Sequence, residues 1–323
     1  MPKEIRLYEH GGSDQLKWEE GPVGTPGPGE MLIRQTAIGV DYIDVYVRTG
    51  LYARPLPTGL GFEAAGVITA LGPRVRGFKV GERVGYSLNA PGAYAEQRLL
   101  AVGEAIKLPR GISDEHAAAV LLKGLTAWVL VRQTFKIKRG HVVLLPAAAG
   151  GVGLIVSQWA HALGARVIGV VGSPDKAAMA KRHGCKQVLV GYDNLAERVR
   201  ELTQGKGVDV VYDGVGKDTF MAALDCLKPR GLMVTFGNAS GAAPPLAPLE
   251  LMRRGSLFLT RPTSGDYLAT PGARRKAAQE LFTMIKNRKI RVHIGQRFAL
   301  KDAARAHEAL ESRRTLGSTV LLP

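Results

Sequence analysis

The hydrophobic residues of this chain follow one pattern in its first third and a different pattern from Val142 onward. In the first third, short apolar runs such as Met31–Arg34, Gly66–Leu71 and Arg83–Tyr86 alternate with turns such as Pro26–Gly29. Short runs bounded by glycine and proline are typical of strands joined by tight turns. We therefore expect the first third to form a compact and mostly antiparallel β domain.

From Val142 onward, runs typical of strands alternate with segments in which apolar residues recur at helical spacing. The expected strands are Val142–Leu145, Arg166–Val171, Gln187–Val190, Val208–Tyr212, Gly231–Phe236 and Ser256–Leu259. The expected helices are Gly151–Leu163, Pro174–His183, Leu195–Leu202 and Lys217–Cys226. Because crossovers between parallel strands are right-handed, this alternation predicts a parallel sheet covered by helices on both faces, which is a Rossmann domain.

Two further regions flank the alternating part. Apolar residues recur on one face of Asp114–Arg132, which predicts a helix, with Ser113 as its N-cap. After Ser264 the pattern changes again, and we expect two helices and two strands, at Gly272–Lys286, Val292–Ile294, Lys301–Ser312 and Ser318–Leu322. We expect this tail to pack back on the N-terminal domain.

The segment Ala147–Gly153 lies where the first strand of the alternating part turns into its first helix. At such a position the free N–H groups and the positive dipole end of the helix attract an anion. Glycines there let the backbone approach a pyrophosphate closely. The sequence Gly150-Gly151-Val152-Gly153 is a variant of G-x-G-x-x-G. It predicts a dinucleotide-binding turn; the alternative is a tight turn without a ligand.

The residues after the second strand of this part indicate which dinucleotide is bound. An NAD-binding unit carries an acidic residue about 20 residues after the glycines, where it binds the ribose 2′-hydroxyl. Here Gly172 and Ser173 stand at the strand tip, and Lys176 follows one turn later. Because a serine hydroxyl and a lysine hold a phosphate by charge-assisted hydrogen bonds, the sequence favours NADP(H).

Three residues near this tip have alternative interpretations. Asp175 is an acid in the same region, but it follows Pro174 and is expected to serve the first turn of the next helix. Lys176 would otherwise lie on a solvated helix face. Tyr192, just past the third strand, is a candidate to stack on or hydrogen-bond to the adenosine phosphate, and would otherwise be an ordinary surface tyrosine.

The chain also has a large excess of positive charge. Its 323 residues carry a formal net charge of +16, with a pI near 10.0. A basic balance is typical of proteins that bind nucleic acid, an anionic membrane or an anionic small molecule. The basic residues are scattered among acidic ones, and clusters such as Arg274-Arg275-Lys276 are too short for a nucleic-acid arm. We favour attraction of a phosphorylated cofactor and leave nucleic-acid binding open as a side activity.

The rest of the composition predicts a cytoplasmic protein without a membrane partner. No uncharged apolar stretch reaches the about 18 residues expected of a membrane span. The N-terminal segment Met1–Arg6 lacks the apolar region of a signal peptide. Two cysteines, Cys185 and Cys226, cannot form a disulfide framework and are expected to be core or half-buried thiols.

Several segments, taken together with the glycine turn, resemble a known family. They are Gly39–Tyr52, Gly61–Gly66, Leu122–Ala127 and Phe236–Gly241. With them the chain resembles the zinc-independent quinone oxidoreductases, the zeta-crystallin-like branch of the medium-chain dehydrogenase/reductase superfamily. It looks most similar to bacterial NADPH:quinone reductases, and the likeness extends over its whole length.

The resemblance implies an α/β fold in which a Rossmann dinucleotide-binding domain is inserted into a GroES-like, mostly antiparallel β catalytic domain. The implied boundaries are 1–122 and 264–323 for the two parts of the catalytic domain, and 123–263 for the cofactor-binding domain. It further implies that NADPH and substrate bind in an interdomain cleft. Members are commonly homodimers joined through their cofactor domains.

The resemblance also implies roles for individual residues. Those implied to lie at the nicotinamide half of the cofactor are Tyr42, Ile43, Asp44, Tyr46, Thr126, Val215, Gly237, Asn238, Ala239, Ser240, Thr260 and Arg261. Those implied to meet its phosphates are Gly150, Gly151 and Val152 at the pyrophosphate, and Gly172, Ser173, Lys176 and Tyr192 at the 2′-phosphate. Arg313 is implied to reach the cofactor from the C-terminal segment, and Tyr46 and Tyr52 to border the substrate.

Two departures from related patterns bear on the chemistry. The zinc branch of the superfamily has Gly-His-Glu where this chain has Gly61-Phe62-Glu63, and a cysteine near Gly39–Asp44, where this chain has none. Phenylalanine cannot bind zinc, so we expect no metal, and we expect Glu63 to hold backbone or pack nearby. The family usually has asparagine where this chain has Asp41; this residue either faces substrate or ribose, or only caps the following helix.

The expected reaction is hydride transfer from the nicotinamide to a quinone, which is electron-poor enough to react without a metal. The developing oxyanion would be met by a tyrosine hydroxyl, a backbone N–H or water. Tyr46, Tyr52 and Asp41 are the candidate catalytic residues, and each tyrosine would otherwise be a packing residue. Two alternatives remain: a reductase of enones and other activated alkenes, and an NADPH-binding protein whose main role is nucleic-acid contact.

Overall fold

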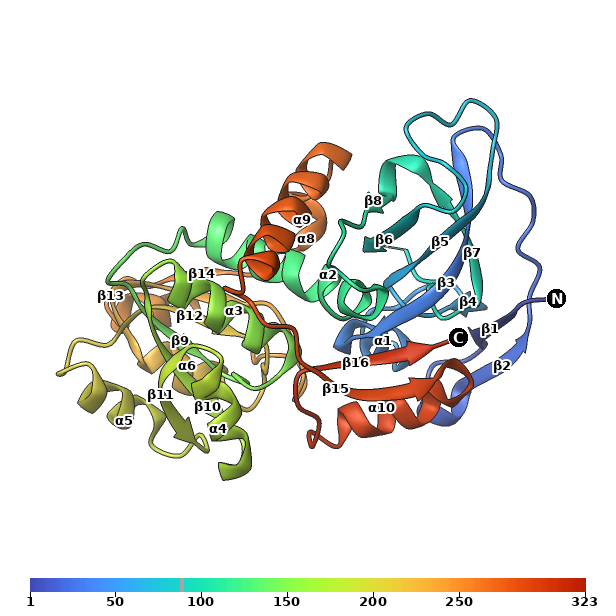
Figure 1. Cartoon of the computed structure of the whole chain (residues 1–323). Helices are drawn as coiled ribbons and strands as arrows, with labels where there is room; N and C mark the ends of the chain where they lie inside the picture. Colours follow the sequence, from blue (N-terminus) through green and yellow to red (C-terminus); the bar gives the residue numbers. More distant parts are fainter. Residues whose placement is uncertain (88–89) are drawn as a thin grey trace. The chain divides into compact units, whose positions relative to one another are not determined.

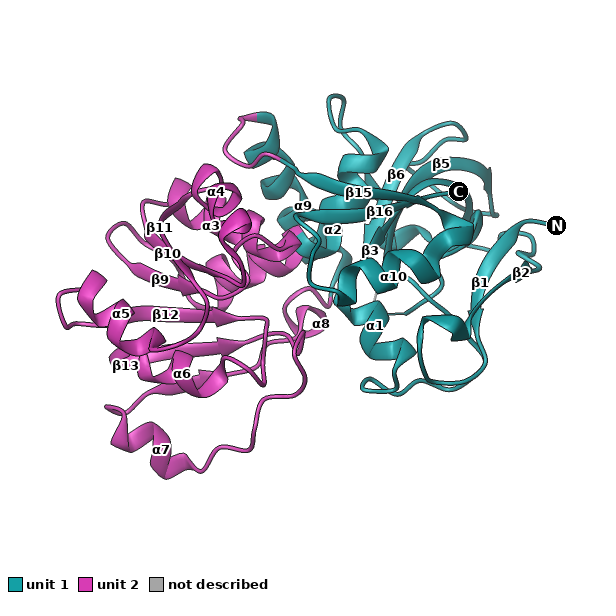
Figure 2. Cartoon of the chain, turned by 90° about the horizontal axis from the view of Figure 1, so that it is seen from below, with its two compact units in different colours: residues 1–123, 270–286, 292–323 teal, residues 124–269, 287–291 magenta. Residues whose placement is uncertain are grey.

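The structure, a computed structural model, describes residues 1–87 and 90–323 (Figure 1). The chain divides into two compact units (Figure 2). Unit 1 comprises residues 1–123, 270–286 and 292–323, and unit 2 comprises residues 124–269 and 287–291. In the part of the chain that is described, no helix has the length and apolar character needed to cross a membrane.

Unit 1 is built mainly from antiparallel strands. Within the described residues its larger sheet has seven strands, with β15-β16-β3-β5-β6-β8 as successive neighbours and β7 paired with β3. These strands are β3 (Glu30–Val40), β5 (Glu63–Leu71), β6 (Arg83–Ser87), β7 (Gln97–Ala101), β8 (Ile106–Lys107), β15 (Ile294–Ala299) and β16 (Ser318–Leu322). A smaller sheet joins β2 (Leu16–Glu20), β1 (Lys3–Leu7) and β4 (Thr58–Gly59). The predicted antiparallel β domain is confirmed.

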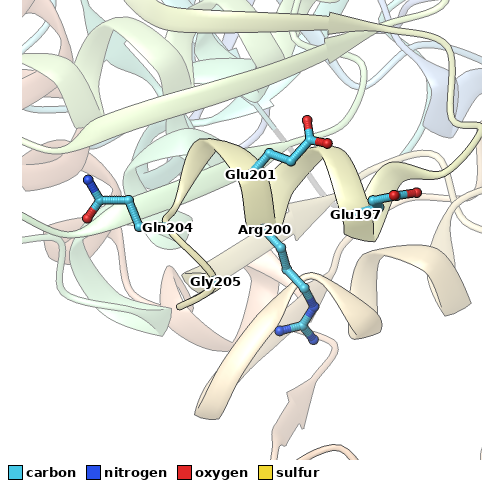
Figure 3. Close-up of a pocket in the computed structure, with 5 residues that line it drawn as sticks. All are labelled: Glu197, Arg200, Glu201, Gln204 and Gly205. Carbon is cyan, nitrogen blue, oxygen red and sulfur yellow. The ribbon is translucent and has the colours of Figure 1, made fainter.

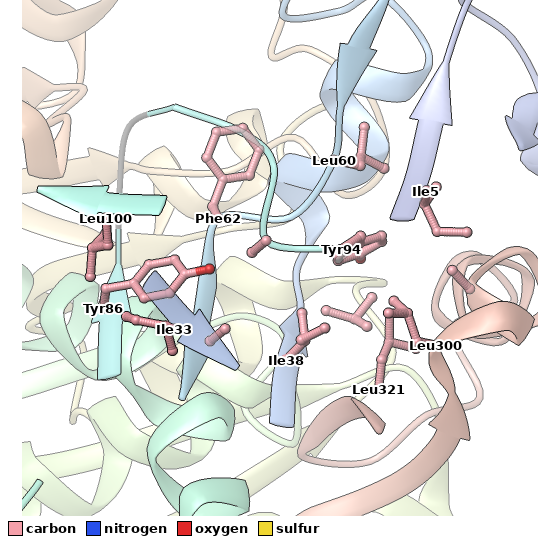
Figure 4. Close-up of a cluster of buried hydrophobic side chains, with 14 of the residues drawn as sticks. Ile5, Ile33, Ile38, Leu60, Phe62, Tyr86, Tyr94, Leu100, Leu300 and Leu321 are labelled. Carbon is pink, nitrogen blue, oxygen red and sulfur yellow. The ribbon is translucent and has the colours of Figure 1, made fainter. Parts of the chain in front are cut away.

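The C-terminal tail completes unit 1. Strand β16 pairs antiparallel with β3, with Val320 opposite Gly39, so the tail packs back on the N-terminal part as predicted. The helices of this unit are α1 (Tyr42–Arg48), the first part of α2 (Asp114–Trp128), α9 (Pro271–Lys286) and α10 (Ala303–Glu311), and short 3₁₀ turns lie at Ser13–Gln15, Val102–Glu104 and Leu300–Asp302. Figure 4 shows part of its core, where Phe62 and Tyr94 lie among aliphatic side chains.

Unit 2 is a parallel sheet with strand order β11-β10-β9-β12-β13-β14. The strands are β9 (Val142–Leu145), β10 (Arg166–Val171), β11 (Cys185–Val190), β12 (Val208–Asp213), β13 (Leu227–Thr235) and β14 (Phe258–Thr260). The helices are α3 (Gly151–Ala162), α4 (Pro174–Arg182), α5 (Leu195–Leu202), α6 (Phe220–Asp225), α7 (Pro248–Arg253) and α8 (Ser264–Tyr267). Helices α3 and α4 lie on one face of the sheet and α5 and α6 on the other (Figure 2). This is the predicted Rossmann arrangement.

Some predicted boundaries are wrong for identifiable reasons. The strand expected at Val292–Ile294 instead runs over Ile294–Ala299, where residues are alternately half-buried and exposed and include Gln296 and Arg297, so no apolar pattern marks it. The helix expected to begin at Lys217 begins at Phe220, because the Lys217 N–H donates to Gly241 O in a neighbouring loop.

The other shifts are extensions and shortenings of elements that were correctly typed. Helix α2 ends at Trp128 and continues as a π-helical turn over Val129–Thr134 rather than reaching Arg132 as regular helix. Its N-terminus is as predicted, since Ser113 Oγ accepts a hydrogen bond from His116 N–H at 3.1 Å. Strand β12 extends by one residue, to Asp213, which is fully buried.

Candidate functional site

The glycine turn lies at the point where the strand order of unit 2 reverses. The chain leaves β9 and crosses to β10 on one side, whereas β12 pairs with β9 on the other side. In open parallel sheets, dinucleotides bind at this switch point, beyond the carboxyl ends of the strands. The main chain of Ala148 donates to Val170 O at 3.0 Å and thereby joins the turn to β10.

The first turn of α3 is arranged to receive an anion. Its N-cap is Gly150, which has no side chain to accept from the first-turn N–H groups that lack intrahelical partners. A Cβ at Gly153 would lie 2.9 Å from Ala148 C and closer still to Ala147 O, so the turn fits glycine and no larger residue there. The N–H groups and the helix dipole together favour a phosphate at this position.

The tip of β10 is open and carries polar side chains. A Cβ at Gly172 would meet no atom within 4 Å, and Ser173 is the N-cap residue of α4. Asp175 lies in the first turn of α4, as predicted, and its hydrogen bond with Ser173 lowers the pKa of the carboxyl. Lys176 is half-buried, and burial lowers its pKa while Asp175 opposes this. Tyr192 is half-buried and packs against the core of unit 2.

Two loops follow β12 and β13, and they hold most of the other residues predicted in unit 2. Val215 O accepts hydrogen bonds from Ser240 N–H at 2.8 Å and Ser240 Oγ at 2.9 Å. Arg261, just after β14, donates to Thr235 Oγ1 at 3.1 Å and to Gly237 O at 3.4 Å. The structure thus brings Val215, Gly237, Ser240 and Arg261 together at the carboxyl edge of the sheet.

In unit 1, the residues predicted at the reacting end gather on α1 and the segment after it. The ring centroids of Tyr42 and Tyr46 are 6.0 Å apart, and those of Tyr46 and Tyr52 are 5.2 Å apart. The Tyr42 hydroxyl donates to Leu310 O at 3.1 Å. Burial raises the pKa of Tyr42, and nearby Arg313 offsets only part of this rise. Tyr46 is buried, whereas Tyr52 is exposed at the end of this aromatic row.

Asp41 has a second contact besides its position at the start of α1. It is the N-cap residue, and its N–H donates to Asp44 Oδ2 at 2.7 Å. Its own carboxylate lies 2.8 Å from Lys123 Nζ and is only 7% exposed, so Asp41 forms an ion pair in addition to its place in the capping box of α1. Whether it faces substrate or ribose stays a prediction. Asp41 Oδ2 is buried without a hydrogen-bond partner in the described structure.

Lys123 is buried between two carboxylates, and sequence reasoning gave it no role. Its ammonium lies 2.8 Å from Asp41 Oδ1 and 2.8 Å from Glu63 Oε1. Glu63 Oε2 accepts from Leu122 N–H at 2.6 Å, so Glu63 holds backbone as predicted. Burial raises the pKa of Glu63 and would lower that of Lys123, but the two carboxylates outweigh burial and raise the pKa of Lys123. A single lysine among apolar neighbours of a helix was the available signal.

A second polar cluster joins Asp44 on α1 to Tyr94 and to His307 on α10. Tyr94 donates to Asp44 Oδ2 at 2.9 Å and lies 3.1 Å from His307 Nε2, and all three residues are buried. Burial, reinforced by the charge of Asp41, raises the pKa of Asp44 to about 8, against the hydrogen bonds that it accepts. Burial lowers the pKa of His307 to about 3, so this histidine is neutral. The described contacts of Asp44 are therefore internal ones.

The hollow drawn in Figure 3 is a different feature. It is lined by Glu197, Arg200, Glu201, Gln204 and Gly205, on α5 and the turn that follows it. Because Gly205 precedes β12, this hollow lies at the amino edge of the parallel sheet, opposite to the glycine turn. It is not part of the candidate cofactor site.

Comparisons with known proteins cover the whole chain. Residues 27–110 match a family described as alcohol dehydrogenase GroES-like domain, and residues 151–270 match one described as zinc-binding dehydrogenase. A quinone oxidoreductase of Pseudomonas aeruginosa is 50% identical, with 100% of each chain covered. The chain belongs to the quinone oxidoreductase family.

Two further members or relatives of the quinone oxidoreductase family are informative. The crystal structure of Escherichia coli quinone oxidoreductase complexed with NADPH superimposes with a TM-score of 0.97 at 46% identity, covering 99% of this chain and 100% of that one. A 2-haloacrylate reductase of a Burkholderia species is 45% identical, with 98% of each chain covered. The predicted family and fold class are confirmed.

The donor groups of this chain do not fit the zinc ion that the zinc-binding family description implies. Phe62 is fully buried in the core of unit 1 and offers no ligand atom (Figure 4). Both carboxylate oxygens of Glu63 are occupied, one by Lys123 and one by Leu122 N–H. Residues 1–87 and 90–323 contain no group of three or more His, Cys, Asp or Glu side chains placed to share a metal.

Proposed function

We propose that this member of the quinone oxidoreductase family reduces quinones with NADPH by hydride transfer, without a metal. The observation that carries the proposal is the Gly150-capped N-terminus of α3 at the switch point between β9 and β12. Quinone as the substrate class is supported by the names of the full-length relatives. A cytoplasmic location stays a prediction.

The residues of unit 2 fit NADP(H) in three places. The pyrophosphate would be held by the N–H groups at Gly150, Gly151 and Val152. The 2′-phosphate would be held at the tip of β10, where no acid stands and Gly172, Ser173, Lys176 and Tyr192 are the proposed contacts. The nicotinamide half would lie near the loops after β12 and β13, with Thr126, Val215, Gly237, Asn238, Ala239, Ser240, Thr260 and Arg261 as the proposed contacts.

The roles of the unit 1 residues stay predictions. Tyr42, Ile43, Asp44, Tyr46 and Arg313 were predicted to contact the cofactor, and Tyr46, Tyr52 and Asp41 to act on the substrate. For Tyr42 and Arg313 the supporting observation is their mutual proximity. For Asp41 the supporting observation is that its buried Oδ2 has no hydrogen-bond partner in the described structure and is left able to accept a hydrogen bond.

In this reaction the protein's residues would meet the charge that develops on the quinone and hold the reacting groups in place. Bound NADPH supplies a hydride, and the quinone takes up one further proton to become a hydroquinone. Tyr46 and Tyr52, in edge contact with each other, would offer a hydroxyl to the quinone oxygen that becomes negative. The Tyr46 ring is buried and therefore held in one place, and that orients its hydroxyl. Lys123 would hold the Asp41 side chain in place through their ion pair.

A steady-state assay tests the proposal. NADPH oxidation is followed with a simple benzoquinone, with and without a strong chelator, and the anaerobic product is identified as hydroquinone. We expect quinone-dependent turnover that chelation does not change. No turnover with any of several quinones would refute the quinone assignment, and loss of rate on chelation would refute the metal-free assignment.

Reduction of activated alkenes is the second candidate function. It is favoured by the 45% identity to a 2-haloacrylate reductase, which shares the whole length of the chain. The same hydride donor serves both reactions, since each acceptor has a conjugated electron-poor carbon. A comparison of kcat/KM for benzoquinone and for 2-chloroacrylate discriminates between them, and the larger value identifies the substrate class.

We also propose that two copies of the chain associate through the edge of the unit 2 sheet. Strand β14 is at the end of the strand order and is left with one paired side. Exposed apolar side chains lie on β14, at Phe258 and Leu259, and on α7, which precedes it in the sequence, at Leu249 and Met252. An open strand edge with apolar side chains is suited to pair with a second identical edge.

A further inference from the structure

The carboxylate of Asp213 organises the loop that follows β12. Asp213 is fully buried at the last position of this strand. Its Oδ1 accepts hydrogen bonds from Val215 N–H at 2.8 Å and Thr219 Oγ1 at 2.8 Å, and a longer one from Gly216 N–H at 3.4 Å. One oxygen thus fixes the turn from Gly214 to Thr219 at three points.

This turn packs directly on the loop after β13, backbone against backbone. Phe236 N–H donates to the main chain of Asp213 at 2.8 Å, and Ala239 N–H donates to Gly214 O at 3.2 Å. A Cβ at Gly237 would lie 2.9 Å from Gly214 Cα, and so would displace the loop. The two loops therefore form one unit, which we call the Asp213 loop pair (residues 214–219 and 236–241).

The side chain of Ser240 closes the Asp213 loop pair. Ser240 Oγ donates to Val215 O at 2.9 Å and accepts from Asp218 N–H at 3.0 Å. The position of Val215 is thus fixed from both sides, by Asp213 before it and by Ser240 opposite to it. A shift in the Asp213 carboxylate would move Val215 and, through it, the loop after β13.

The topology places the Asp213 loop pair on one side of the glycine turn. Strand β9 lies between β10 and β12, so the loops after β12 and β13 are on the opposite side from the tip of β10. A dinucleotide that lies across the carboxyl edge, with its 2′-phosphate at β10, brings its nicotinamide half to β12 and β13.

We propose that Asp213 is a positioning residue that holds the Asp213 loop pair in the arrangement that receives the nicotinamide half of NADPH. The proposal rests on the proposed function for the identity of the cofactor. Burying a carboxylate is costly, and a strand end that needed only to be packed would be served by an apolar side chain. The three hydrogen bonds that Oδ1 accepts are what an apolar residue could not supply.

Calorimetric titration with whole and partial cofactors tests the proposal. Adenosine 2′,5′-bisphosphate carries only the phosphate end, whereas NADPH carries both ends. We expect Asp213→Ala to weaken NADPH binding about tenfold or more, since displaced contacts are costly, while the affinity for adenosine 2′,5′-bisphosphate stays within about twofold. Asp213→Asn keeps an oxygen that can accept from Val215 N–H and should recover most of the loss.

Two further variants complete the test. Asp209→Asn is the matched control, because Asp209 is at the other end of β12, where it accepts from Val142 N–H and pairs with Lys228, and both affinities should stay unchanged. Thr219→Val removes one donor to Asp213 and, if Asp213→Ala does not fold, should show the same NADPH-selective loss on a smaller scale.

Equal losses for both ligands, or an unchanged affinity for NADPH, would overturn the positioning role while leaving the proposed function intact. A wild-type chain that binds adenosine 2′,5′-bisphosphate but not NADPH would overturn it as well. A wild-type chain that binds neither ligand would instead overturn the proposed function, and this inference with it.

Discussion

At the scale of single residues, we propose that the discrimination between NADPH and NADH depends on a few side chains at the tip of β10. The tip carries Ser173 as N-cap and Lys176 in the first turn of α4, and the acid in that turn, Asp175, is hydrogen-bonded to Ser173. A lysine that binds a phosphate oxygen contributes a charge-assisted hydrogen bond, which is stronger than a neutral one. NADH offers no phosphate there.

Lys176→Ala should therefore raise the KM for NADPH about tenfold or more and leave the KM for NADH nearly unchanged. Steady-state kinetics with both cofactors at saturating quinone measures this. Lys181→Ala is the control, because Lys181 lies in the last turn of the same helix. Equal effects of Lys176→Ala on the two cofactors would refute the 2′-phosphate assignment.

Lys123 is a residue whose removal should destabilise the fold, because it pairs with two buried carboxylates. Lys123→Met leaves Asp41 and Glu63 buried without their cation, and such a loss typically costs roughly 3–5 kcal/mol of unfolding free energy. Urea denaturation followed by circular dichroism measures it. Asp41→Asn in the Lys123→Met background should restore part of the stability, because one of the two stranded carboxylates is neutralised. Additive losses would show that the ion pair carries no such coupling.

At the scale of elements, the turn between β9 and α3 works through close backbone packing. Gly153 has helical neighbours and no unusual φ angle, so its role is to leave room beside Ala147 O and Ala148. The turn can hold a pyrophosphate only if the N–H groups of the first turn keep their present direction. A side chain at Gly153 would move the turn relative to the helix.

Gly153→Val should thus weaken NADPH binding about tenfold or more, because the displaced N–H groups no longer converge on the phosphate. Fluorescence titration with NADPH gives the affinity. Gly150→Ala is the graded comparison, since its Cβ would lie 3.3 Å from Ala147 O and needs only a small adjustment. If Gly153→Val binds as tightly as wild type, the glycine turn is not the phosphate site.

At the scale of the whole molecule, the open edge at β14 predicts an association of two copies. Phe258 is 60% exposed and Met252 is 61% exposed, which is unusual for large apolar side chains in a folded monomer. Phe258→Asp with Met252→Lys should convert a dimer into a monomer, as measured by light scattering after gel filtration. Tyr8→Asp, at an exposed aromatic residue of unit 1, is the control. A wild-type monomer at all concentrations would refute the proposed association.

Much of the architecture follows from local pattern. Each strand of unit 2 was expected from an apolar run, and helices α3 to α6 from a helical period, because both signals arise within a few neighbouring residues. The short helices α7 and α8 were not expected. The strand β15 was expected too early in the chain, because half of its residues are exposed and Gln296 and Arg297 interrupt any apolar run. The start of α6 was misplaced because a contact with Gly241, far away in the sequence, holds Lys217 outside the helix.

The sequence by itself determined the parallel sheet, the glycine turn at its switch point and the lack of an acid at the tip of β10. Each of these depends on residues that are close together in the chain. Only the tertiary structure decided that Lys123 pairs with Asp41 and Glu63, and that Asp213 fixes the loops after β12 and β13. Buried charges pair with groups that are close in three dimensions but distant in the sequence, and periodicity and local motifs do not report such proximity.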